Sequence, residues 1–153
     1  MSLYNWQVRD DWFNLCETLS LEELSKKRVW GMRSFLHNLF HVIDCEQIWI
    51  NQMQGTPIII KDINEISSLQ EVKLFSEQTR KVTQNFLKLY ISKGEDRVLE
   101  VNNRNGSTNL VPYDKIIRHI VSHEIHHIGQ LSIWSREIGM KPVSSDYIFR
   151  DLV

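Results

Sequence analysis

Apolar residues recur at three- and four-residue steps in four stretches of the chain, which predicts four long amphipathic helices. The four stretches are residues 4–19, 32–54, 68–92 and 113–138. Gly55 with Pro57 follows the second stretch, Gly94 the third and Gly139 with Pro142 the fourth, and these residue types commonly end helices. Four helices of this kind pack most simply as a four-helix bundle.

Three shorter segments connect the long helices. Ser20 and Glu23 have the spacing of a capping box and predict a short helix that ends near residue 28. Residues 58–62 are apolar but too few for a helix, so we expect an extended connection there. Asn105 and Gly106 form a turn signal between two β-prone runs, which predicts a small β-hairpin between the third and fourth long helices. The expected fold class is therefore all-α, a four-helix bundle with one hairpin.

The length and composition of the chain fit one domain spanning residues 1–153, with no repeat or linker to divide it. Lysine and arginine number 18 and aspartate and glutamate 19, which gives a net charge of −1 without a basic block, so we expect no nucleic-acid partner. No apolar run approaches the ~18 residues of a membrane span, and the N-terminal residues lack a signal-peptide pattern. The sequence thus favours a cytoplasmic protein without a membrane partner, in which the isolated Cys16 and Cys45 are reduced thiols.

His123 and His127 stand four residues apart in the last predicted helix, so both imidazoles project from one face, one turn apart. His41 lies in the second long helix, and both helices carry an apolar stripe along the histidine face, which predicts that the imidazoles face the core. The stripes contain Ile116, Ile120, Leu131 and Trp134 in the last helix and His37, Cys45 and Ile48 in the second. Two helices can thus offer three imidazole nitrogens to one transition-metal ion, an arrangement that recurs in helical metalloproteins.

Other assignments of these side chains stay open from the sequence. Each histidine taken alone fits a hydrogen-bonded core or surface residue better than a metal ligand. Cys45, one turn after His41, is an alternative ligand because a thiolate binds zinc strongly. His119 could pair with His123, although His119 and His127 are two turns apart and cannot share one ion. Gln130 lies near the angular position of His123, where it could orient a ligand.

Residues 123–127 also match the HExxH pattern of zinc proteases, in which Glu124 would be the general base. The extended protease motif is absent, because positions 130 and 133 are Gln and Ile rather than Gly and His. Proteolysis is therefore disfavoured. Glu124 lies about 100° around the helix from His123, so we expect a helix-surface carboxylate or one that faces a neighbouring helix, with a supporting role at the metal as the alternative.

Two segments of the chain resemble the DinB/YfiT-like family of four-helix-bundle metalloproteins. Residues 41–49 look like the family's first ligand helix, in which a histidine is followed by an acidic residue and then an aromatic one. Residues 123–131 look like its final-helix signature, in which two histidines precede Gly129 and Gln130. The predicted hairpin and the aromatic-rich N-terminal helix fit as well, so the resemblance covers nearly the whole chain.

This resemblance implies that His41, His123 and His127 bind one divalent transition metal, with zinc or nickel as the expected ion. It also implies an enzyme of the thiol S-transferase kind, in which the metal activates a low-molecular-weight thiol such as bacillithiol, or water, for attack on a small electrophile. The alternative is a stress-related metal-binding bundle or interaction protein without catalysis. In the first case the partners are small molecules, and in both we expect a homodimer.

Overall fold

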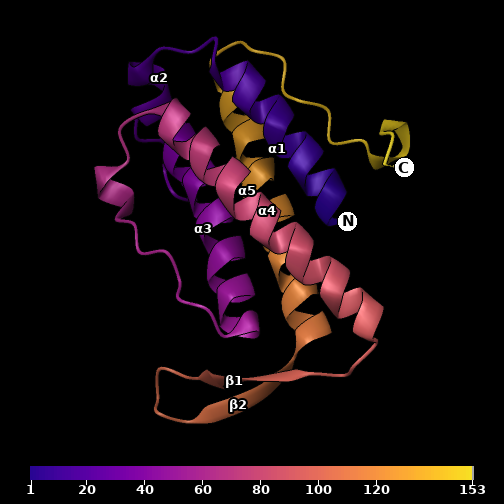
Figure 1. The fold of residues 1–153 in the computed structure, drawn as a ribbon. Helices are drawn as coiled ribbons and strands as arrows, with labels where there is room; N and C mark the ends of the chain where they lie inside the picture. The colour runs from indigo at the N-terminus through magenta and orange to yellow at the C-terminus, as the bar shows by residue number, and fades with distance from the viewer. Residues whose placement is uncertain (153) are drawn as a thin grey trace.

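The computed structural model describes residues 1–152. Its long helices form a bundle, with a two-stranded hairpin at one end (Figure 1). The elements in chain order are α1 (Ser2–Cys16), α2 (Leu21–Ser25), α3 (Phe35–Gln54), the 3₁₀ turn η1 (Ile63–Glu65), α4 (Leu69–Lys93), β1 (Val98–Asn102), β2 (Thr108–Pro112), α5 (Tyr113–Glu137) and the 3₁₀ turn η2 (Tyr147–Phe149). Helix α3 packs against α4 and α5, and α1 packs against the same two helices. The predicted all-α bundle with a small hairpin is confirmed.

Serine side chains set the starts of three helices. Oγ of Ser20 accepts a hydrogen bond from the backbone N–H of Glu23, as the capping-box spacing predicts. Ser34 caps α3 and Ser68 caps α4 in the same way. Helix α3 therefore begins at Phe35, whereas the periodicity of the sequence placed its start near residue 32.

The loop that joins α2 to α3, residues 26–34, has an unusual backbone. Trp30 and Arg33 have φ angles of 72° and 70°, and within residues 1–152 they are the only non-glycine residues with positive φ. Gly31 between them has a φ angle of 56°. Left-handed backbone at a residue other than glycine costs on the order of 1–3 kcal/mol, so contacts around this 26–34 loop must hold it in place.

Strands β1 and β2 form the predicted antiparallel hairpin. Glu100 lies opposite Leu110, and Asn102 lies opposite Thr108. Their connection spans residues 103–107 and is longer than a tight two-residue turn. Gly106, with a φ angle of 82°, supplies the left-handed residue that this connection needs.

The core consists of two hydrophobic clusters with a layer of polar side chains between them. The larger cluster includes Trp12, Phe35 and Leu131, and the smaller one includes Ile50 and Phe86. The polar side chains buried between the clusters include Arg9, Glu46, Ser76, Thr83 and Glu124. No helix within residues 1–152 combines the length and the apolar content needed to cross a membrane.

Candidate metal centre

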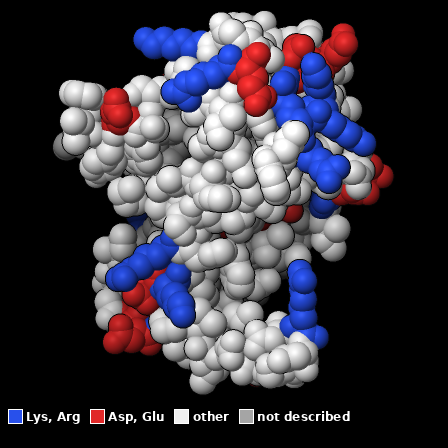
Figure 2. Space-filling view, turned by 180° about the vertical axis from the view of Figure 1, so that it is seen from behind, with Lys and Arg blue, Asp and Glu red and all other residues white. Residues whose placement is uncertain are grey.

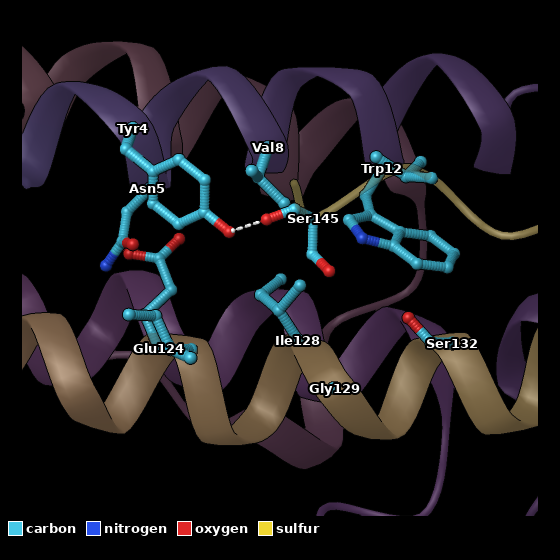
Figure 3. A pocket seen from close by; sticks show the side chains of 11 residues that line it. Tyr4, Asn5, Val8, Trp12, Glu124, Ile128, Gly129, Ser132 and Ser145 are labelled. Carbon is cyan, nitrogen blue, oxygen red and sulfur yellow. Dashed lines mark hydrogen bonds between the residues drawn. The ribbon is translucent and has the colours of Figure 1, made fainter. Parts of the chain in front are cut away.

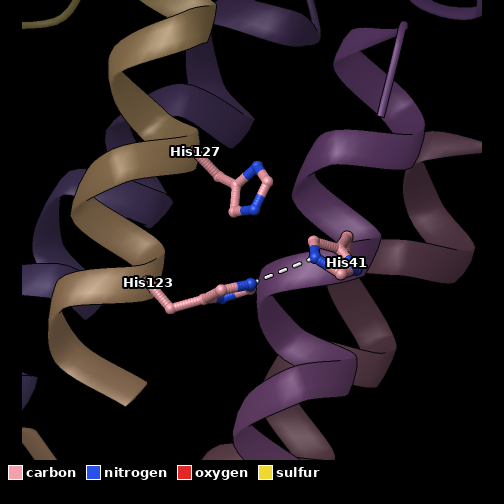
Figure 4. Close-up of side chains that lie close together, drawn as sticks. All are labelled: His41, His123 and His127. Atoms are coloured by element: carbon pink, nitrogen blue, oxygen red, sulfur yellow. Dashed lines mark hydrogen bonds between the residues drawn. The ribbon is translucent and has the colours of Figure 1, made fainter. Parts of the chain in front are cut away.

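Three histidines from two helices point toward one another (Figure 4). His41 projects from α3, whereas His123 and His127 project from α5. Nε2 of His41 lies 3.1 Å from Nε2 of His123, and the three ring centroids are 4.5, 4.7 and 4.8 Å apart. One nitrogen from each ring lies within 4.8 Å of the other two. We call these three residues the histidine cluster.

The donor atoms and the spacing of the histidine cluster fit a divalent transition metal. Imidazole nitrogens bind zinc at about 2.0–2.1 Å, which in tetrahedral geometry places two of them about 3.3 Å apart. The 3.1 Å between the Nε2 atoms of His41 and His123 is close to this separation. All three side chains are half-buried, so one side of the cluster remains accessible. The cluster could therefore hold a metal ion through three nitrogens and leave a further coordination position for another ligand.

The histidine cluster favours neutral imidazoles, and neutral imidazole is the form that binds metals. Burial, reinforced by the neighbouring imidazoles of His127 and His41, lowers the pKa of His123 to about 4. Burial also lowers the pKa of His41 and the pKa of His127. Nδ1 of His123 is buried and has no hydrogen-bond partner within residues 1–152, which further disfavours a doubly protonated ring.

Gln130 and Asn38 fix the position of His127. Nδ1 of His127 lies 3.1 Å from Oε1 of Gln130, and because an amide oxygen only accepts, Nδ1 carries the proton. Nε2 of His127 then keeps a lone pair for a metal ion. Nδ2 of Asn38 donates to the backbone oxygen of His127 at 2.6 Å. Gln130 thus makes an orienting contact of the kind that the sequence suggested for it.

The other candidate ligands lie outside the histidine cluster. Within residues 1–152 the group of converging ligand atoms consists of the three histidines and does not include Cys45. Burial raises the pKa of the Cys45 thiol to about 12, so this thiol is protonated at neutral pH. His119 is exposed and contacts Trp49 edge-on, with ring centroids 6.0 Å apart. His126 is exposed as well, in agreement with its angular position on α5.

Glu124 points away from the histidine cluster into the polar layer of the core. Its two carboxylate oxygens accept hydrogen bonds from Arg9 at 2.7 and 2.8 Å. The same guanidinium donates to Glu46 at 2.7 Å, and the three side chains are at most 3% exposed. The interpretation of Glu124 as a surface carboxylate is therefore wrong, and the one that turns it toward a neighbouring helix is correct. A general-base role is disfavoured because Arg9 engages both oxygens.

Arg9, Glu46 and Glu124 form a buried ion triad that joins α1, α3 and α5. Burial alone would lower the pKa of Arg9, but the negative charges of Glu124 and Glu46 outweigh it and raise this pKa above its ordinary value. Neutral partners complete the triad: Arg9 also donates to Ser76, and Trp6 and Thr83 donate to Glu46. The sequence reasoning missed Arg9 as a core residue.

The buried face of each ligand helix is centred beside the histidines rather than on them. In α5 the buried line runs through Ile116, Ile120, Glu124, Ile128 and Leu131. His123 and His127 lie at its edge. In α3 the predicted stripe of His37, His41, Cys45 and Ile48 is half-buried throughout. The prediction that the imidazoles face the core is therefore wrong in this detail, and their place between core and solvent leaves the three rings partly accessible.

A separate cavity lies between α1, α5 and the C-terminal segment (Figure 3). It has a volume of about 180 Å³ and a largely apolar lining that includes Val8, Trp12 and Ile128. Oη of Tyr4 donates to the backbone oxygen of Ser145 at 2.6 Å beside it. Glu124 is the one histidine, cysteine or acidic residue among the described residues that line the cavity, and Arg9 already binds its carboxylate. The chemistry of the molecule is therefore concentrated at the histidine cluster.

Comparison with known proteins gives two matches that span the chain. The model of the DinB family matches residues 1–151. A protein of Bacillus subtilis (strain 168), described as uncharacterized protein YizA, is 42% identical over 149 residues, which cover 97% of this chain and 92% of that protein. The similarity therefore extends over the whole bundle, including both helices that carry the histidine cluster.

Proposed function

Because this chain belongs to the DinB family and gathers three histidines that could hold a metal ion, we propose that it is a metal-dependent thiol S-transferase. Its substrates would be a low-molecular-weight thiol of the bacillithiol type, or water, and a small electrophile. The observation that carries the proposal is the half-buried cluster of three neutral imidazoles with an accessible side. A zinc or nickel ion bound there would lower the pKa of a thiol or water in its remaining position and so provide a nucleophile at neutral pH.

The side chains around the cluster fit a reaction in which the nucleophile comes from outside the protein. The thiol of Cys45 has a pKa of about 12 and is a poor nucleophile at neutral pH. Both carboxylate oxygens of Glu124 are engaged by Arg9, and the side chain points away from the histidine cluster. In the proposed reaction the thiol sulfur forms a bond to a carbon of the electrophile. The leaving group departs with the electron pair of the broken bond, and the thiol proton passes to water.

Metal analysis and a thiol-dependent assay test this proposal together. We expect about one zinc or nickel ion per chain, a change in the spectrum of the cobalt-loaded protein on addition of thiol, and turnover of a chloronitrobenzene or a bimane halide that requires the thiol. His123→Ala should lose the metal and the turnover. His126→Ala is the matched control, because His126 lies on the same helix, is exposed and stands outside the cluster.

Two results would contradict the proposal at different levels. Stoichiometric metal in His123→Ala would refute the assignment of the ligands. A protein that holds the metal but shows neither a spectral response to thiols nor thiol-dependent turnover would be a metal-binding bundle without this catalysis.

A further inference from the structure

The 26–34 loop contacts the residues that fix His127 at two points. A Cβ atom at Gly31 would collide with Oε1 of Gln130, so the backbone of the loop packs directly on this amide. The backbone N–H of Met32 donates to Oδ1 of Asn38, and Nδ2 of Asn38 donates to the backbone oxygen of His127. The loop is therefore part of the surroundings of the histidine cluster, although it is far from α5 in the sequence.

A cavity of about 300 Å³ lies under this loop. Its lining comes from the end of α2, the loop, the start of α3 and the η1 region, and comprises Ser25, Lys27, Gly31, Met32, Arg33, Ser34, His37, Ile63 and Asn64. We call it the loop pocket. His37 stands four residues before His41, which is about 6 Å along the axis of α3. The lining of the loop pocket therefore reaches to within about one turn of α3 from His41.

The charge of the loop pocket is positive. Lys27 and Arg33 contribute to its lining, and none of its described lining residues is acidic. Within residues 1–152 neither cation has an ion-pair partner, whereas the adjacent Arg28 is paired with Glu23. In Figure 2 several lysine and arginine side chains gather over the α2 end of the molecule, with acidic side chains beside them. Asp62 and Glu65, at the two ends of η1, lie next to the lining residues Ile63 and Asn64 in the chain but outside the lining itself, so the positive charge is confined to the wall that Lys27 and Arg33 form.

The strained backbone of the loop supports a role in binding. Trp30 and Arg33 adopt left-handed backbone, yet the Trp30 side chain is 80% exposed and gains little from burial. Strain of this kind tends to occur at ligand sites, where the conformation presents a particular group. Here it directs Arg33 to the lining of the loop pocket.

The geometry points to the loop pocket as an anion subsite of the metal centre. This inference rests on the proposed function and names its substrate class: a thiol that carries a carboxylate or a phosphate roughly 6–11 Å from its sulfur, one to two helical turns along α3. The sulfur would lie at the histidine cluster, and the anionic group would lie between Lys27 and Arg33.

Binding of matched thiols to the cobalt-loaded protein tests the anion subsite. The probes are ω-mercaptoalkanoates of increasing chain length, the mercaptoalkyl phosphates of the same lengths, and the uncharged mercaptoalkanols. Affinity is read from the cobalt spectrum. We expect one range of chain lengths at which a charged thiol binds about tenfold more tightly than its uncharged counterpart, a preference that decreases with added salt. The series that shows the preference identifies carboxylate or phosphate as the anionic group.

The double variant Lys27→Gln/Arg33→Gln should lose this preference while it keeps the cobalt and its affinity for mercaptoalkanols. Lys81→Gln/Lys88→Gln is the matched control, since it removes the same charge from exposed positions of α4 and should keep the preference. Equal affinities for charged and uncharged thiols at every length, or a preference that survives the double substitution, would overturn the anion subsite alone. If no thiol of any kind alters the cobalt spectrum, the proposed function and the subsite both fail.

Discussion

The ion triad and the histidine cluster both draw side chains from α3 and α5. They differ in whether other side chains of the protein satisfy their charges and hydrogen-bonding atoms. Glu124 of the ion triad is the chain neighbour of His123, and Glu46 follows His41 by little more than one turn of α3. In the triad, charges that are at most 3% exposed find partners in other side chains of the chain. In the histidine cluster the rings are half-buried, lie nitrogen to nitrogen, and include a buried Nδ1 atom without a partner in residues 1–152.

This difference distinguishes polar residues that stabilise the fold from polar residues that bind a ligand. A buried charge network that is fully paired holds its helices together and needs no ligand. Imidazole nitrogens that lie 3.1 Å apart can share at most one proton, so their remaining lone pairs are complementary to a cation, which the chain itself does not supply. The triad also joins the two helices that carry the histidines, so it contributes to the spacing between His41 and His123.

Removal of Arg9 is expected to have the largest effect on stability. Arg9→Met leaves Glu46 and Glu124 buried without a counter-charge, which should lower the free energy of unfolding by about 3–5 kcal/mol. Urea unfolding of the metal-free protein measures this loss. Arg118→Met is the matched control, because Arg118 pairs with Asp114 at exposed positions and should change stability by less than about 1 kcal/mol. A similar small change in Arg9→Met would mean that the triad does not hold the core.

The histidine cluster should contribute stability only when a metal is present. Zinc at 100 times its dissociation constant should raise the free energy of unfolding by about 2.7 kcal/mol, because the ion binds the folded chain alone. His123→Ala should abolish this gain and should cost only about 1 kcal/mol in the metal-free protein, where His123 loses a single side-chain hydrogen bond, that between its Nε2 and Nε2 of His41, and its Nδ1 has no partner within residues 1–152. Thermal unfolding with and without zinc measures both effects. A large loss of stability in metal-free His123→Ala would mean that His123 stabilises the fold without a metal.

Loss of the hydrogen bond between His127 and Gln130 should have an intermediate effect, on metal affinity. Gln130→Ala removes the acceptor for Nδ1 of His127 and should weaken metal binding by about tenfold, whereas Gln130→Glu keeps an acceptor and should preserve it. Gly31→Ala should reproduce the loss, because the added Cβ displaces the Gln130 amide. Competition with a chromophoric chelator measures the affinity.

Gly129→Ala is the control for the glycine substitution. Gly129 lies in α5 next to Gln130, and a Cβ there meets no atom of the described chain within 4 Å. Alanine is a better helix former than glycine, so Gly129→Ala should keep the metal affinity and raise the free energy of unfolding by up to ~1 kcal/mol. Unchanged affinity in Gly31→Ala would show that the 26–34 loop does not act on His127.

Local patterns predicted most of the fold and the histidine cluster. These patterns involve residues that are close in the chain: the spacing of apolar residues, the cap formed by Ser20 with Glu23, and the glycines after α3 and α4. The structure has the helices and the helix ends that they predict. His123 and His127 are neighbours on one helix face, so their spacing alone brought them together. Only the third histidine, His41, required a pairing between distant segments; the apolar stripes of the two helices suggested this pairing, and the family resemblance implied the same ligand set.

The ion triad and the 26–34 loop depend on contacts that no single segment reveals. Arg9 lies in a polar part of α1, and its burial follows from carboxylates on two other helices. One signal was available: Glu124 stands midway between Ile120 and Ile128, so a charge interrupts the apolar line of α5. The left-handed Trp30 and Arg33 are side chains that rarely adopt that backbone, and nothing in their sequence indicates it.

The smallest expected effect is on the pH dependence of stability. Acid should destabilise the protein through the histidine cluster and not through Arg9 of the ion triad. The pKa of His123 is about 4 in the folded chain and about 6.5 in an unfolded one, so the unfolded chain binds more protons between these values. The stability linked to this residue is therefore complete above pH 6.5 and is lost as the pH falls toward 4. Arg9 keeps its charge throughout, since its pKa is raised.

Urea unfolding of the metal-free protein at pH 7, 6 and 5 checks this expectation. The histidine cluster should account for a loss of less than about 1 kcal/mol between pH 7 and 5, because solvent screens half-buried groups. His123→Ala should lose less stability over the same interval, and Arg9→Met should keep the pH dependence of the original chain at a lower overall stability. Equal pH dependence in His123→Ala and the original chain would mean that the imidazoles titrate freely when folded, and the contrast between a completed and an incomplete polar group would then disappear.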